Sequence, residues 1–258
     1  MPASKSYQEI AQDTLPAASA RAQHPRDASG FALFSKGAAG AAHVMAHRML
    51  DEDRCVRGHR LLGAWLERHT GTGSDWVHLQ WHMAVFELAL GHWQAAFARF
   101  QCHILPAAIT SEDALTDAPA LLWRLALAAR TPIALPWEPL RARALECMRR
   151  VSAPYVTLHH LLVLAGAGDL ASLDRWLQTH APRTDSCNDA LVVRVAVALR
   201  AYTACEYGQA ASALARVTPY ISEVGGSRGQ NELFKQLAQA ARRKASAGDS
   251  LPVYLKAA

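Results

Sequence analysis

Long hydrophobic runs are missing from this sequence of 258 residues. A helix that spans a bilayer needs about 18–20 consecutive apolar residues, and no stretch of the chain approaches that length. The first residues also lack the apolar core of a secretion signal. We therefore expect a cytoplasmic protein that has no membrane partner.

Cysteine is scarce as well: five residues are scattered along the chain and none has the CxxC spacing. These are Cys55, Cys102, Cys147, Cys187 and Cys205. An odd and scattered set argues against both a disulfide framework and a cysteine-based zinc site. In a reducing compartment such residues are expected to behave as small buried hydrophobic side chains.

The chain has no concentrated basic stripe, although 27 basic residues outnumber 22 acidic ones and give a net charge of +5. The single short basic cluster is Arg242-Arg243-Lys244. Proteins that bind nucleic acid usually carry clustered basic residues on one face. We therefore expect no nucleic-acid partner, whereas a diffuse positive charge favours an anionic small molecule as ligand.

Strand-like alternation is absent beyond about five residues at a time. From Gly37 onward, apolar residues recur at helical spacing, which predicts an all-α chain. The preceding segment, 1–36, is rich in small and polar residues and is expected to be weakly structured. Helix breaks are predicted at Pro106, Pro119, Pro132, Pro136, Pro154 and Pro182.

The helical part repeats. Tight turns are expected at Leu90-Gly91-His92-Trp93, at Gly168-Asp169-Leu170 and near Gly208. Equivalent positions in the first helix of each unit fall near His43, His82, Trp123, His160 and Ala198. This spacing predicts about five helical hairpins over 37–258, stacked as a single tetratricopeptide-like solenoid, an α-α superhelix whose first helices line the concave side.

Histidines stand in two pairs with i, i+4 spacing: His43 with His47, and His78 with His82. On a helix this spacing places both imidazoles of a pair on one face. Neighbouring helices pack about 8–10 Å apart, so the two pairs can face each other across adjacent hairpins. His160, on a later first helix, is expected to join them on the concave wall.

Three interpretations of these histidines stay open. The paired residues His43, His47, His78 and His82 are candidate ligands of a transition metal such as Zn or Fe. Without a metal, the same imidazoles and His160 are candidate general acids and bases. In the third interpretation each is a half-buried packing residue without special function.

Two charged residues further along have a functional and a structural interpretation. Asp117 either orients one of the histidines or caps a helix that starts at Pro119. Arg124 either clamps an anionic group or only marks the exit of that helix. Both are candidate site residues, Asp117 for catalysis and Arg124 for substrate binding.

Four more residues are candidates for substrate binding. Trp81 stands between His78 and His82 and is a candidate pocket wall, and His103 is a marginal member of the site. Ser227 is expected to cap a helix that starts near Gln230, whose free N–H groups could receive an anion.

Several segments resemble the tetratricopeptide repeat protein 38 family over about residues 40–240. The matching segments include His43-Val-Met-Ala-His47, His78-Leu-Gln-Trp-His82, Cys102-His-Ile-Leu-Pro106, Leu122-Trp-Arg-Leu125 and Gly225-Gly-Ser227. The resemblance implies a helical solenoid with a histidine-rich interior groove and no agreed reaction. The chain departs from the family in lacking further N-terminal hairpins and in having Asn231-Glu232 where Arg-Asp is usual.

We therefore predict a helical-repeat protein that binds a small molecule in a His-lined concave pocket, and we regard it as a candidate enzyme. The alternative is a non-catalytic scaffold that holds a peptide or partner protein in its groove. The first hairpin has an apolar face that segment 1–36 or a second subunit must cover. A homodimer is expected on that basis.

Overall fold

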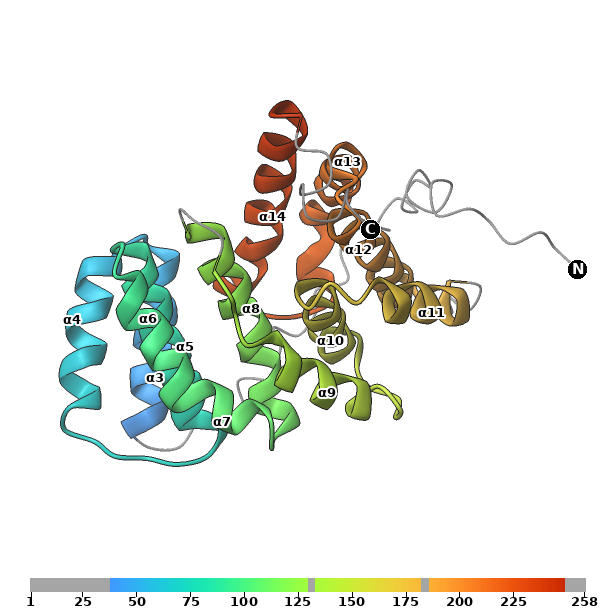
Figure 1. The fold of residues 1–258 in the computed structure, drawn as a ribbon. Helices are drawn as coiled ribbons and strands as arrows, with labels where there is room; N and C mark the ends of the chain where they lie inside the picture. Colours follow the sequence, from blue (N-terminus) through green and yellow to red (C-terminus); the bar gives the residue numbers. More distant parts are fainter. Residues whose placement is uncertain (1–37, 130–132, 182–185, 249–258) are drawn as a thin grey trace, which may run out of the picture.

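The computed structural model describes residues 38–129, 133–181 and 186–248, which form helices and no strand (Figure 1). The prediction of an all-α chain is confirmed. Among these residues no helix is both long and apolar enough to cross a membrane. The predicted weakly structured segment 1–36 and the predicted breaks at Pro132 and Pro182 lie outside the described residues.

Successive helices form hairpins. The hairpins are α3 (Ala38–Asp51) with α4 (Cys55–Leu66), α5 (Ser74–Ala89) with α6 (Trp93–Arg99), α8 (Glu112–Ala128) with α9 (Trp137–Cys147), α10 (Pro154–Gly166) with α11 (Leu170–His180), and α12 (Cys187–Thr203) with α13 (Tyr207–Val217). A π-helical turn, η2 (Phe100–Ile104), and the short α7 (Leu105–Ala108) follow α6. A 3-10 turn, η3 (Thr218–Glu223), leads from α13 to the last described helix, α14 (Arg228–Ser246).

Four of the hairpin turns have the same backbone conformation and hydrogen bond. One residue has a φ between 55° and 78°, and the next N–H donates to the carbonyl five residues earlier at 2.8–2.9 Å. This pattern satisfies carbonyls that the end of a helix would otherwise leave unpaired. The left-handed residues are Asp53, Gly91, Gly168 and Cys205. The recurrence of one turn explains why these hairpins share a geometry.

The first helices of the hairpins lie side by side, in the order α3, α5, α8, α10 and α12. Contacts across this layer keep the repeat spacing of the sequence. The Trp123 indole donates to the Leu162 carbonyl at 2.9 Å, 39 residues away. The Thr203 hydroxyl donates to the Ala165 carbonyl at 3.3 Å, 38 residues away. Residues on the first helices therefore meet their neighbours one repeat apart.

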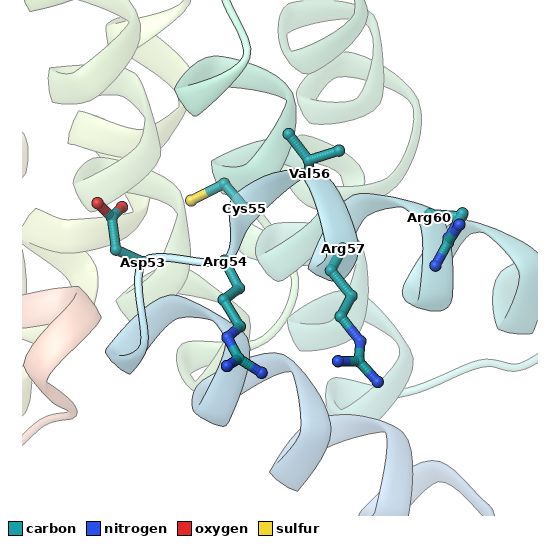
Figure 2. A pocket seen from close by; sticks show the side chains of 6 residues that line it. All are labelled: Asp53, Arg54, Cys55, Val56, Arg57 and Arg60. Carbon is teal, nitrogen blue, oxygen red and sulfur yellow. The ribbon is translucent and has the colours of Figure 1, made fainter.

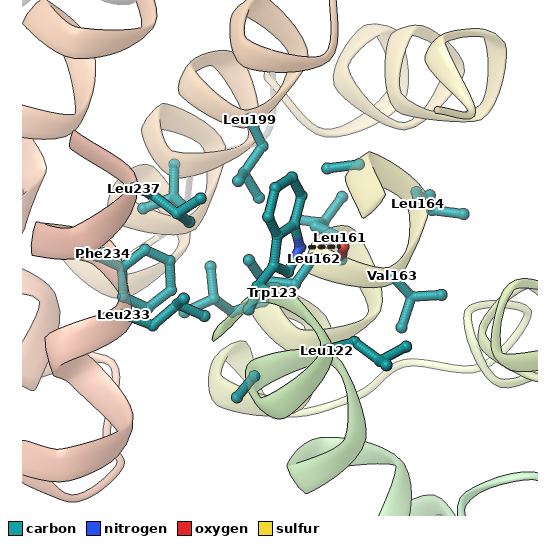
Figure 3. Close-up of a cluster of buried hydrophobic side chains, with 14 of the residues drawn as sticks. Leu122, Trp123, Leu161, Leu162, Val163, Leu164, Leu199, Leu233, Phe234 and Leu237 are labelled. Atoms are coloured by element: carbon teal, nitrogen blue, oxygen red, sulfur yellow. Dashed lines mark hydrogen bonds between the residues drawn. The ribbon is translucent and has the colours of Figure 1, made fainter. Parts of the chain in front are cut away.

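Helix α14 packs against α3, α8 and α13 (Figure 1). Its buried side chains, Leu233, Phe234 and Leu237, reach the core around Trp123 (Figure 3). Burying residues of this size contributes about 1.5–3 kcal/mol each. The last described helix therefore covers part of the face formed by the first helices.

Pro119 does not break a helix, and Asp117 does not cap one. Both residues lie inside α8, which begins after Ser111. Proline removes one N–H from the helix, but this stretch is buried between α5 and α10, and tertiary packing outweighs that loss. Pro106 likewise lies within α7, directly after η2, so the helical run that begins with α6 continues through it. Pro136 and Pro154 do stand at helix starts.

Candidate metal centre

Four imidazoles meet where α3 packs against α5. His43 and His47 come from α3, and His78 and His82 come from α5; we call them the histidine cluster. Ring centroids of neighbouring members are 4.4–4.8 Å apart. One ring nitrogen from each residue lies within 4.8 Å of the others. The four side chains therefore present a compact set of nitrogen donors.

The spacing of these donors can be compared with a tetrahedral metal site. With metal–nitrogen bonds of 2.0–2.1 Å, two ligand nitrogens are about 3.3–3.4 Å apart. The Nε2 atoms of His43 and His47 are 2.8 Å apart, and the widest separation in the cluster is below 4.8 Å. The tetrahedral value falls between these limits, so side-chain rotations would be enough to seat an ion.

His82 is the most deeply buried member of the cluster. Its exposed fraction is 0%, and neither ring nitrogen makes a hydrogen bond to the described part of the chain. A buried polar group without a partner costs about 1–3 kcal/mol. A bound cation would satisfy one of the two nitrogens.

Burial also controls the protonation of the cluster. Removal from water and, second, electrostatic interaction with the neighbouring His78 lower the pKa of His43 to about 3 and that of His47 to about 4. The pKa of His82 is lowered well below its ordinary value for the same two reasons. These three imidazoles are therefore neutral at pH 7, which is the form that binds metal ions.

Asp117 lies directly behind His78. Its Oδ2 is 2.8 Å from Nδ1 of His78, and the carboxylate is buried with an exposed fraction of 4%. A carboxylate that accepts from Nδ1 holds the ring in one tautomer and leaves Nε2 as the donor to a metal. Trp81 stacks on His78 at 5.5 Å and forms a buried wall of the cluster.

The structure does not bring the other sequence-predicted residues into the cluster. Arg124 donates to the carbonyls of Ala120, Gly229 and Gln230, so its guanidinium ties α8 to α14. Ser227 and Gln230 form a reciprocal capping box at the start of α14. His103 is exposed on η2.

His160 lies apart from the cluster as well. It belongs to α10, and α8 packs between α10 and α5. Its neighbours are Glu112 and Cys147, whose donor atoms lie within 4.8 Å of an imidazole nitrogen. Sequence reasoning missed both neighbours, because no short motif links positions on three different helices.

An open hollow of about 500 Å³ lies at the turn between α3 and α4 (Figure 2). The described residues that line it are Asp53, Arg54, Cys55, Val56, Arg57 and Arg60. None belongs to the histidine cluster, so this hollow is not the predicted His-lined pocket. Arg54 and Arg57 extend to the same side (Figure 2), but exposed charges hold an anion only weakly.

No family model matches the chain, and no solved structure matches it. The histidine cluster combines four imidazoles with a buried carboxylate behind His78.

Proposed function

We propose that this protein is a metal-binding helical-repeat protein and that the histidine cluster holds one transition-metal ion. The observation that carries the proposal is His82, a fully buried imidazole without a hydrogen-bond partner among the described residues and surrounded by three further imidazoles. A metal ion explains both the burial and the convergence of the rings.

The low pKa values favour metal binding over metal-free acid–base catalysis. An efficient general base has a pKa near the working pH, whereas those of His43 and His47 are about 3 and about 4. Such imidazoles accept protons poorly at pH 7. Their lone pairs, however, stay available to a cation without a competing proton.

Zinc is the ion we assign to the cluster. Four imidazole donors suit the tetrahedral preference of Zn²⁺, and Fe, Cu and Ni also accept such ligands. His43 and His82 are buried and His78 is held by Asp117, whereas His47 is only half-buried. His47 is therefore the ligand that a small molecule could displace most easily. An anionic molecule is favoured there, because neutral imidazoles leave the positive charge of the metal ion uncompensated.

Two features favour this small-ligand site over a peptide-binding scaffold. Helix α14 packs against α3 and α8, which are first helices and would line the groove of a tetratricopeptide-like solenoid. That face is thus partly covered by the chain itself. The family resemblance of the paired-histidine segments, which implies a histidine-rich interior, is consistent with the same assignment.

Titration of the metal-free protein with Zn²⁺ in a calorimeter tests the proposal. We expect His82→Ala to lose one equivalent of tight binding while His180→Ala binds like the wild type. His180 is a matched control because it is exposed and its Nδ1 contacts a backbone carbonyl one turn away. His47→Ala provides a second test at a half-buried position, in case removal of His82 disturbs folding. Unchanged stoichiometry and affinity in both cluster variants would refute the metal site.

A further inference from the structure

A second group of donor side chains lies where α8, α9 and α10 meet. Glu112 is the first residue of α8, Cys147 is the last residue of α9, and His160 is near the middle of α10. One carboxylate oxygen, the sulfur and one ring nitrogen lie within 4.8 Å of one another. The Nε2 atom of His160 is 3.8 Å from Oε1 of Glu112.

The imidazole in this group is buried and makes no hydrogen bond to the part of the chain that the structure describes. His160 has an exposed fraction of 0%, and neither ring nitrogen makes a hydrogen bond to the described residues. Cys147 is also fully buried, whereas Glu112 is half-buried and gives the group its access to solvent. Burying an imidazole without a hydrogen bond costs free energy. Packing alone therefore does not explain why it faces a thiol and a carboxylate.

We propose that Glu112, Cys147 and His160 form a second metal site, which takes a zinc-like divalent cation. Oxygen, sulfur and nitrogen donors together suit Zn²⁺, and three protein ligands leave a fourth position open. A thiolate and a carboxylate carry two negative charges, which neutralise the ion in a buried place. The site is separate from the histidine cluster, and the proposal does not depend on it.

The distance between the nitrogen and oxygen donors needs only a small adjustment. In a tetrahedral zinc site a nitrogen and an oxygen ligand are about 3.4 Å apart, compared with 3.8 Å between His160 and Glu112. Arg150, 3.6 Å from Glu112, is an exposed side chain that can turn away. Ser152 donates to Glu112 at 3.4 Å and would keep the carboxylate oriented.

The sulfur acts here as a ligand and not as a nucleophile. Burial and the nearby charge of Glu112 raise the pKa of the Cys147 thiol, and reactive cysteines have the opposite shift together with solvent access. Binding of the cation converts this thiol to a thiolate, and the sulfur lone pair forms the metal bond while one proton leaves to the buffer.

Cobalt titration distinguishes this site from the histidine cluster. Co²⁺ occupies zinc sites, and only a sulfur ligand gives a thiolate-to-cobalt charge-transfer band in the near ultraviolet. We expect the metal-free wild type to develop this band, and His82→Ala, in which only the second site remains, to develop it to saturation at one equivalent per chain. The band should persist in His82→Ala, so that failure of one site is not mistaken for failure of the other.

Variants assign the band to its ligands. Cys147→Ser should abolish it, whereas Cys102→Ser, at an exposed cysteine, should leave it unchanged. Glu112→Gln should retain the band but weaken cobalt affinity at least tenfold. If far-ultraviolet circular dichroism shows that Cys147→Ser does not fold, the affinity of Glu112→Gln is the measurement that tests the site. Absence of the band in the wild type, its persistence in folded Cys147→Ser, or unchanged affinity in Glu112→Gln would overturn the proposal.

Discussion

Acidification of the metal-free protein should destabilise it through the histidine cluster. Burial and neighbouring charge lower the pKa of His43 to about 3 and of His47 to about 4, from 6.5 in the unfolded chain. Below pH 6.5 the unfolded chain therefore binds more protons than the folded one. Unfolding becomes more favourable as the pH falls, until the folded-state pKa values are reached.

The size of the effect follows from these values. For each of the two histidines, the free energy of unfolding falls by about 1.4 kcal/mol per pH unit below 6.5. At pH 5 this amounts to about 2 kcal/mol for each residue and about 4 kcal/mol for the pair. Because a domain is stable by only about 5–15 kcal/mol, the loss should be plain in urea unfolding curves at pH 7 and pH 5, recorded with a chelator present.

The double variant His43→Gln, His47→Gln isolates this contribution. Between pH 7 and pH 5 the unfolding free energy of this variant should fall by about 4 kcal/mol less than that of the wild type, because neither glutamine titrates. His69→Gln is the control, since its ring stacks on Trp65 and its Nδ1 contacts the Trp65 carbonyl outside the cluster. If the wild type loses less than about 1 kcal/mol of unfolding free energy, or the double variant loses as much as the wild type, the two histidines are not the source of the acid sensitivity.

Three further substitutions separate metal binding from folding. Asp117→Asn should weaken Zn²⁺ binding in the calorimeter about 10–100-fold by removing the carboxylate behind His78; unchanged affinity would contradict its positioning role. Ser227→Ala should lower the unfolding free energy by about 1 kcal/mol through loss of the helix cap, while zinc affinity stays constant; a drop in affinity would instead tie Ser227 to the site. Gly58→Ala should lower the melting temperature, because its Cβ would lie 2.3 Å from Cζ of the buried Phe86. Overpacking of this kind costs about 1–3 kcal/mol. A melting temperature at or above that of the wild type would show that the ring can move aside.

Much of the architecture could be predicted from periodicity. The helical class is confirmed, and the i, i+4 pairs lie on neighbouring helices as their spacing predicted. Prediction was wrong at Pro119, because burial on both sides of α8 outweighs the cost of one missing N–H. Local proline rules do not include that tertiary contribution.

The location of His160 shows a second limit. Membership of a first helix predicts that His160 lies with the other histidines, but a helix in the middle of the layer has neighbours on both sides. Asp117 contacts α5 through His78, whereas Glu112, on the same helix, lies beside α10. Which neighbour a residue meets depends on its angular position around the helix, and repeat spacing alone does not determine that angle.

Ligation of a metal ion by the histidine cluster can be observed in the crystal. Crystals of the protein would be soaked in Zn²⁺ and diffraction recorded on both sides of the zinc absorption edge. We predict an anomalous peak with zinc–nitrogen distances of about 2.0–2.1 Å to at least three of His43, His47, His78 and His82. A clear map without a peak among these four side chains, at a zinc concentration that saturates binding in solution, would show that the cluster does not hold zinc.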